Sequence, residues 1–285
     1  MQTTIEQPIR IHGVGIHSGN DVTVNLLPAG PGEGIGFIRT DMESSVRIPA
    51  HFTRVHHTVL STSLKENGHE VQTVEHLMAC FSALGIDNVT VTLDSPEIPI
   101  MDGSARHIVA LLDEAGVAVL DARRRIARVL EAVTVSDDDT SATLEPRKGS
   151  DDGLDMDYTI VYDNPHIGTQ RFSCTMNPEC FREEVAPART FGLMEDVNKL
   201  LGMGKGMGGS FETAVIIDDE GVLNPDGLRF PDECVRHKCL DAVGDLALFG
   251  MPLSGRFIAR KSGHRLNLRL LEELSRRGTY EIVTE

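Results

Sequence analysis

The first part of the chain alternates apolar and polar residues with a period of two. Short runs of this kind, separated by turns rich in glycine and proline, occupy residues 9–12, 22–27 and 37–40. An alternating run bounded by such turns predicts a half-buried β-strand. The sequence therefore predicts a meander of strands, which the strand-like residues 51–72 continue.

The period changes to that of a helix at Thr73. In residues 73–85 apolar side chains recur at helical spacing between a Thr73 cap and a stop at Gly85. A strand at 88–93 and a helix at 105–116, capped by Ser104, follow. We expect this first unit to end near Ala122.

The rest of the chain repeats the order of strands followed by helices. The predicted strands are at 128–137, 141–146, 156–164, 210–218 and 254–261, and helical patterns begin at Pro178, near Ala188 and at Leu266. Two units that each open with strands and later supply helices favour an α+β fold. We predict a first domain at 1–122 and a second at 126–285, with an insertion at about 195–219.

The strongest helix signal, Pro231–Gly250, also carries polar residues that a packed core does not need. His237, Asp241 and Asp245 recur every four residues, so their side chains share one face of the helix. A histidine and a carboxylate one turn apart can bind the same Zn²⁺ ion. An isolated pair of this kind is more often an ordinary surface contact, so a metal site needs a third ligand from elsewhere.

His76 is the candidate for that third ligand. It follows Glu75 in the first turn of the predicted helix at 73–85, and Glu75 then projects about 100° around the helix, where it can reach a metal-bound water. The alternative is that Glu75 only complements the helix dipole and His76 is a half-buried polar residue. Cys80, one turn from His76, could instead complete a closed structural zinc site, but we assign it to the core.

Two other histidines, His17 and His264, fall in predicted turns. A histidine in a loop is usually solvated and without a catalytic role, and we expect this of His17. His264 follows the strand at 254–261, at a strand end where working residues are common. Its role depends on its partner.

Composition narrows the choice of partners. The formal net charge of −16 argues against a nucleic-acid binder, although it does not exclude a small anionic substrate. The five cysteines are odd in number and form no C-x-x-C pair, which favours a reducing compartment. The sequence has neither a signal-peptide pattern nor an apolar run near the ~18 residues that span a bilayer. We expect a cytoplasmic monomer without stable membrane insertion.

A glycine-rich segment, Gly204–Gly209, matches the spacing of a dinucleotide-binding fingerprint. It follows a helix and precedes a strand, which is the reverse of the order that a phosphate site requires. We interpret it as a flexible turn. A nucleotide kinase or dehydrogenase is therefore a poor alternative.

Taken together, the segments TVEHLMA, EIPIMDGSA, ARTFG, LRFPDECVRHKCLDAVGDL and KSGH resemble, in this order, the zinc-dependent UDP-3-O-acyl-N-acetylglucosamine deacetylases. The resemblance covers nearly the whole chain. It implies cytoplasmic lipid A biosynthesis and a UDP-linked acylated amino sugar as the substrate. It also implies two similar α+β domains, each with an insertion, whose helical layers pack between their sheets.

The resemblance also implies roles for individual residues. The zinc ligands of the family fall on His76, His237 and Asp241, and its general base falls on Glu75. Its acid falls on His264, oriented by Asp245. Further positions that match the family are Thr190 for stabilisation of the oxyanion, and Lys238, Phe191 and Tyr162 for contacts with the substrate. The insertion at 195–219 corresponds to one that forms a passage for the acyl chain.

This residue set is chemically consistent with amide hydrolysis. Three protein ligands leave a fourth zinc position for water, and a carboxylate base and a cationic histidine can move the protons. A protein with only a structural zinc site would use Cys80 and be indifferent to Glu75. A nucleotide binder would need no zinc.

Overall fold

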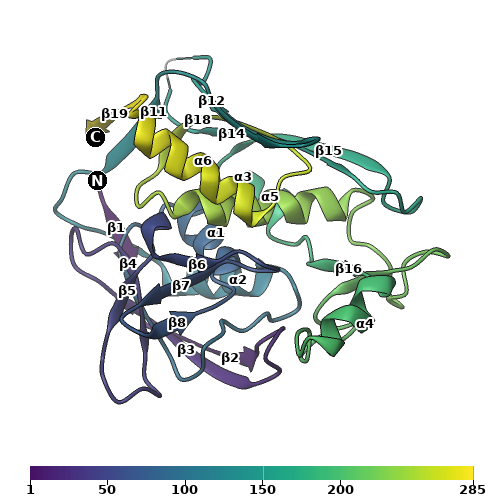
Figure 1. Ribbon diagram of the computed structural model, residues 1–285. Helices are drawn as coiled ribbons and strands as arrows, with labels where there is room; N and C mark the ends of the chain where they lie inside the picture. The colour runs from purple at the N-terminus through teal and green to yellow at the C-terminus, as the bar shows by residue number, and fades with distance from the viewer. Residues whose placement is uncertain (150, 285) are drawn as a thin grey trace.

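The computed structural model describes residues 1–149 and 151–284. Two main β-sheets lie on opposite sides of a helical layer, as Figure 1 shows. This arrangement confirms the predicted α+β class. No helix in these two ranges combines the length and the apolar character needed to cross a membrane.

The first main sheet is built from the predicted N-terminal strands. Its five strands, in spatial order, are β2 (Ile9–Val14), β3 (Asp21–Pro28), β9 (Val89–Leu93), β4 (Ile35–Arg39) and β5 (Arg47–Pro49). In β3 the alternate residues Val22, Val24 and Leu26 are buried, as the period of two predicts. Only the pairing of β4 with β9 is parallel; the other three pairings are antiparallel.

Smaller strand groups complete the first part of the chain. One sheet contains β6 (Val55–His57), β7 (Ser63–Glu66) and β8 (His69–Val71), and another pairs β1 (Thr3–Ile5) with β10 (Val117–Val119). A short 3₁₀ turn, η1 (Phe52–Arg54), precedes β6. The pairing of β1 with β10 brings the start of the chain against residues near the predicted boundary at Ala122. The domain boundary itself stays a prediction.

The second main sheet has seven strands. They are β11 (Arg125–Val129), β12 (Val133–Asp137), β13 (Thr140–Glu145), β14 (Leu154–Val161), β15 (Thr169–Met176), β18 (Leu253–Arg260) and β19 (Tyr280–Thr284). The late strand β18 is central, because it pairs with β11, β13 and β14. Its residues Phe257 and Ala259 are buried.

The helices between the sheets bring distant parts of the sequence together. They are α1 (Glu75–Ala83), α2 (Arg106–Ala115), α3 (Pro178–Cys180), the π-turn η2 (Phe181–Val185), α5 (Glu233–Ala247) and α6 (His264–Arg277). Helix α1 packs directly against α5, and α6 also packs against α5 (Figure 1). Residues about 160 positions apart thereby meet at one place, since α1 begins at 75 and α5 at 233.

The predicted insertion forms a small unit of its own. Strand β16 (Phe191–Leu193) leads into α4 (Met194–Gly202), and the chain returns as β17 (Val215–Ile217), parallel to β16. The glycine-rich turn lies between α4 and β17, as expected. This unit projects from one side of the molecule in Figure 1.

Some predicted helix ends were wrong. Thr73 does not cap α1, which starts after Val74 without a side-chain cap. Helix α2 starts after Ala105, one residue later than predicted, and the Ser104 hydroxyl accepts a long hydrogen bond from the backbone NH of Arg106, its first residue (3.4 Å). The Thr73 hydroxyl instead donates a hydrogen bond to Glu97 (3.1 Å). His264 is the first residue of α6 and not part of the preceding turn. At Thr73 the difference arises because a tertiary hydrogen bond to Glu97 engages the hydroxyl that would have capped the helix.

Candidate metal centre and active site

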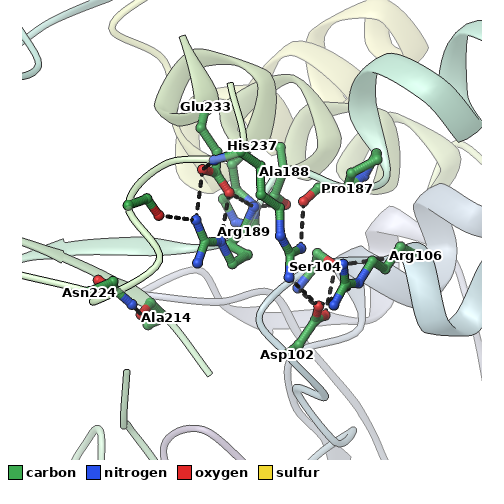
Figure 2. A network of polar contacts seen from close by, with 12 residues as sticks. Asp102, Ser104, Arg106, Pro187, Ala188, Arg189, Ala214, Asn224, Glu233 and His237 are labelled. Carbon is green, nitrogen blue, oxygen red and sulfur yellow. Dashed lines mark hydrogen bonds and ion pairs between the residues drawn. The ribbon is translucent and has the colours of Figure 1, made fainter. Parts of the chain in front are cut away.

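Helix α5 is anchored at its start by a buried ion pair. The guanidinium of Arg189 donates to both carboxylate oxygens of Glu233, at 2.8 and 3.0 Å, and the backbone NH of Arg189 donates to the same carboxylate at 2.9 Å (Figure 2). Both side chains are buried. The pair holds the segment that begins at Ala188 against α5, so the Ala188 carbonyl lies 3.1 Å from Nδ1 of His237.

The three predicted metal ligands converge at this point. The possible donor atoms of His76, His237 and Asp241 all lie within 4.8 Å of one another, and all three residues are buried. Oδ1 of Asp241 lies 3.5 Å from Nε2 of His76 and 3.3 Å from Nε2 of His237. Four ligands at about 2.1 Å around Zn²⁺ in a tetrahedron are separated by about 3.4 Å, so these separations fit a zinc ion.

The protonation states also suit a cation. Burial lowers the pKa of His237 to about 4, which keeps its imidazole neutral. Because Nδ1 of His237 faces the Ala188 carbonyl, Nε2 is the nitrogen left for a metal. Burial alone would raise the pKa of Asp241, but the charge of Lys238 holds it well below its ordinary value. The neutral nitrogen of His237 and the ionised oxygen of Asp241, together with a nitrogen of His76, form a donor set that zinc prefers.

Glu75 lies beside this cluster. It is 3 % exposed, and burial raises the pKa of its carboxyl. Its Oε2 accepts a hydrogen bond from the backbone NH of Thr62 (3.1 Å). Donor atoms of Glu75, Asp241 and His264 form a second group within 4.8 Å. Glu75 therefore faces the same space as the candidate ligands.

His264 is held by Asp245, the third of the polar residues that share one face of α5. Nδ1 of His264 lies 3.1 and 2.9 Å from the two oxygens of Asp245. Burial alone would lower the pKa of His264, but the charge of Asp245 and its hydrogen bond raise this pKa to about 9. The imidazole is therefore cationic at neutral pH, and its Nε2 lies 3.9 Å from Oε1 of Glu75.

A cavity of about 430 Å³ opens onto these groups. The predicted site residues that line it are Glu75, His76, Tyr162, Thr190, Phe191, His237, Lys238, Asp241 and His264. The ring of Phe191 stands edge-on to those of Tyr162 and His237, with centroids 5.7 and 6.5 Å apart. The ammonium group of Lys238 already contacts Oδ2 of Asp241 (2.7 Å), so it is paired with a candidate ligand as well as placed at the cavity.

Cys80 takes no part in the cluster. It is fully buried, burial raises the pKa of its thiol, and its sulfur lies 3.9 Å from the Ala105 carbonyl. Among the described residues, the groups that could hold a metal do not include it. The assignment of Cys80 to the core is confirmed.

The expectation for His17 was wrong. His17 lines the cavity with Ile16 and Thr58, and its Nδ1 is buried without a hydrogen-bond partner among the described residues. Burial lowers the pKa of its imidazole. No local signal distinguishes it from a solvated loop histidine. The turn that carries it is held by a distant residue, Glu97, whose carboxylate accepts hydrogen bonds from the backbone NH groups of His17 and Ser18.

The sequence of the chain is similar to those of known proteins. Residues 2–276 match the family described as UDP-3-O-acyl N-acetylglycosamine deacetylase. A protein named UDP-3-O-acyl-N-acetylglucosamine deacetylase from Myxococcus xanthus is 46 % identical over 99 % of this chain and 89 % of its own length. The protein of the same name from Haemophilus influenzae is 43 % identical over 99 % of this chain and 93 % of its own length.

The class of protein follows from the fold, the site and these similarities: the chain is an α+β protein with a candidate metal centre between two sheets. It belongs to the UDP-3-O-acyl-N-acetylglucosamine deacetylase family. The resemblance noted in the sequence is thereby confirmed.

Proposed function

We propose that this protein hydrolyses the N-acetyl group of UDP-3-O-(3-hydroxyacyl)-N-acetylglucosamine in lipid A biosynthesis. The products are acetate and the UDP-3-O-acyl-glucosamine with a free amine. The observation that carries the proposal is the meeting of Glu75, His264 and the cluster of His76, His237 and Asp241 at one cavity.

Zinc is the metal that the donor set favours. His76, His237 and Asp241 would hold the ion and leave a position free for water or substrate. Bound zinc would lower the pKa of the attacking water toward about 7 and polarise the acetamide carbonyl. The neutral state of His237 and the ionised state of Asp241 support the assignment of a bound cation.

Glu75 acts as the general base. Its position beside the ligand cluster allows it to accept a proton from water as the water attacks the acetamide carbon. Burial raises the pKa of Glu75, which strengthens it as a base toward neutral pH. The bond from the Thr62 NH engages Oε2 and leaves Oε1 directed at His264 across 3.9 Å.

His264 acts as the general acid. Asp245 keeps the imidazole protonated through Nδ1, so Nε2–H can stabilise negative charge on the oxyanion and then donate a proton to the leaving amine. The C–N bond breaks as the nitrogen gains this proton. We assign Thr190 a further stabilising contact with the oxyanion, because it lines the same cavity.

The remaining lining residues would bind the substrate. Lys238 supplies a cationic group and Phe191 and Tyr162 supply aromatic faces, in a protein whose net charge is −16. We assign Tyr162 to the uracil ring, on which an aromatic side chain can stack. The local positive charge of Lys238 also suits an anionic UDP group.

The insertion at about 195–219 would hold the acyl chain. Leu201, Met203, Met207 and Phe211 are exposed by 46, 65, 58 and 50 %, so this one unit offers several apolar side chains that an acyl chain could cover. The insertion is tied to the first part of the chain, since the NH of Met207 donates to the His17 carbonyl and the NH of Gly208 to the Ile16 carbonyl. This contact places the apolar unit beside the catalytic cavity.

We also propose that the protein has domains at 1–122 and 126–285 and acts as a cytoplasmic monomer. Glu75 and His76 come from the first domain, and His237, Asp241 and His264 from the second, so neither domain alone would be active. A single chain supplies every proposed catalytic group. The five cysteines are all free thiols, which is consistent with a reducing compartment.

A direct test measures acetate release from the UDP-linked acylated sugar by the wild type and by Glu75→Ala. The variant is expected to keep its zinc and to lose about 10²–10⁴-fold in kcat, the usual worth of a positioned base. Cys80→Ala serves as the control and should retain both zinc and rate. A wild type that releases no acetate, or a Glu75→Ala enzyme with an undiminished rate, would contradict the proposal.

A further inference from the structure

Thr62 contacts the proposed base and the residue that orients the proposed acid. Its backbone NH donates to Oε2 of Glu75 (3.1 Å), and its hydroxyl donates to Oδ1 of Asp245 (2.7 Å). Thr62 is 2 % exposed and does not line the catalytic cavity. It therefore contacts two site residues from the protein interior and has no access to a substrate in the cavity.

These contacts close a ring. The backbone NH of Thr62 contacts the carboxylate of Glu75, which lies 3.9 Å from Nε2 of His264. Nδ1 of His264 contacts Asp245, and Asp245 accepts the hydrogen bond from the Thr62 hydroxyl. The 3.9 Å step is the one link longer than a hydrogen bond. It lies where the base and the acid both face the cavity. Thr62 thus contacts Glu75 directly and is linked to His264 through Asp245.

The ring also joins the two parts of the chain. Thr62 and Asp245 are 183 residues apart, and their bond runs from the loop before β7 to helix α5. The carboxylate of Asp245 accepts further hydrogen bonds from Nδ1 of His264 and from Nδ2 of Asn267 (2.8 Å), both on α6. Among these three donors, Thr62 alone comes from the first part of the chain.

We propose that Thr62 is a positioning residue that sets the distance between Glu75 and His264. The inference rests on the proposed function, because it takes Glu75 as base and His264 as acid. Without the hydroxyl, Asp245 loses the donor that fixes the orientation of its carboxylate from the Glu75 side. The imidazole of His264 can then turn with that carboxylate, and the spacing between base and acid is no longer fixed.

The alternative is that Thr62 only stabilises the fold, and a matched threonine separates the two roles. Thr4 is also buried (4 % exposed) and does not line the cavity; its hydroxyl donates to the Asn88 carbonyl (2.7 Å) and accepts a hydrogen bond from the Ala29 NH (3.0 Å). Thr4→Val removes a buried hydroxyl of the same kind without touching the site. A purely structural role predicts the same kinetic behaviour for Thr62→Val and Thr4→Val.

The experiment compares the zinc-loaded wild type with Thr62→Val, Thr62→Ser and Thr4→Val in the acetate-release assay. Valine keeps the shape of threonine, while serine keeps the hydroxyl. Thr62→Val is expected to lower kcat roughly tenfold or more, the range for loss of a hydrogen bond to a charged group, with KM and zinc content unchanged. Thr62→Ser is expected to recover most of the rate, and Thr4→Val to keep the wild-type kcat.

Suppose that the wild type is active and that folded, zinc-loaded Thr62→Val has the same kcat. This result would overturn the inference while leaving the proposed function intact. A Thr62→Ser enzyme as slow as Thr62→Val, or a parallel loss of zinc in Thr62→Val, would overturn it as well. If Thr62→Val does not fold, Thr62→Ala also removes the hydroxyl and supplies the same comparison without the two methyl groups of valine. A wild type that releases no acetate would instead refute the proposed function itself.

Discussion

Gly244 of α5 lies directly against the backbone of Glu75 in α1. A Cβ added at position 244 would overlap the carbonyl oxygen of Glu75 and stand 2.9 Å from its Cα. The absence of a side chain therefore lets the helix that carries His237 and Asp241 approach the helix that carries Glu75 and His76. The site depends on this close approach, because each helix holds only part of it.

The first prediction concerns this contact. Gly244→Ala would push α1 and α5 apart, since the obstructing atoms belong to backbone and cannot rotate away. We expect a loss of about 1–3 kcal/mol in the free energy of unfolding, typical of overpacking, together with weaker zinc binding. Denaturant unfolding and metal analysis measure the two effects.

Gly202→Ala in α4 is the matched control, because nothing lies within 4 Å of an added Cβ there. It should change neither zinc binding nor stability by a comparable amount. If Gly244→Ala binds zinc and unfolds like the wild type, the close approach is not required.

The second prediction concerns the ligand set. Alanine at His76, His237 or Asp241 should weaken zinc binding by more than the roughly 10–100-fold that outer partners of a metal site contribute, and activity should fall with it. Cys80→Ala should keep zinc, because the Cys80 sulfur lies against the Ala105 carbonyl and outside the cluster. Zinc titration of the purified variants provides the measurement. Retention of zinc by His237→Ala with loss by Cys80→Ala would reverse the assignment.

The third prediction concerns pH. Asp245 raises the pKa of His264 from 6.5 to about 9, so the stabilising pair with the imidazolium is complete below pH 6.5 and is lost as the pH rises through about 9. The basic limb of kcat/KM should follow this loss. Asp245→Asn removes the charge, so we expect the basic limb to move to lower pH and the maximal rate to fall.

Asp87→Asn is the control for the third prediction, since it removes the same charge from a distant pair with Arg124 (2.9 Å). Its pH profile should match that of the wild type. A basic limb that stays in place in Asp245→Asn would mean that another group governs it.

The fourth prediction concerns the acyl chain. Each buried methylene contributes about 0.8 kcal/mol, so a polar group in the passage should weaken binding of a long chain far more than that of a short one. Met207→Gln is therefore expected to raise KM for a long-chain substrate selectively, with zinc content unchanged. Met42→Gln, at an exposed methionine between β4 and β5, is the control. Equal losses for both chain lengths in Met207→Gln would show that the acyl chain lies elsewhere.

Local patterns predicted much of this site. His237, Asp241 and Asp245 share a helix face because of a four-residue period, and Glu75 precedes His76 at a helix start, so both segments are visible in the sequence. The assignment of Asp245 to His264 came from the family resemblance, and the two residues do contact each other. The catalytic roles stay predictions until they are measured.

Other features depend on tertiary contacts and have no local signal. Thr62 is one of several serines and threonines in a strand-like stretch, and only its contact with Asp245, 183 residues away, distinguishes it. In the sequence, Gly244 is an ordinary residue of a helix, and only the contact of α5 with the Glu75 backbone shows why a glycine is needed there. The turn that carries His17 is likewise held by Glu97, 80 residues further along the chain.

Removal and return of the metal test the central claim most directly. The purified protein is stripped with a chelator, and acetate release from UDP-3-O-acyl-N-acetylglucosamine is followed as Zn²⁺ is added back. We expect the stripped protein to be inactive and the rate to be restored as zinc binds at one equivalent per chain, with no restoration in His237→Ala. Full activity in the metal-free protein, or zinc-dependent recovery in His237→Ala equal to that of the wild type, would contradict the account.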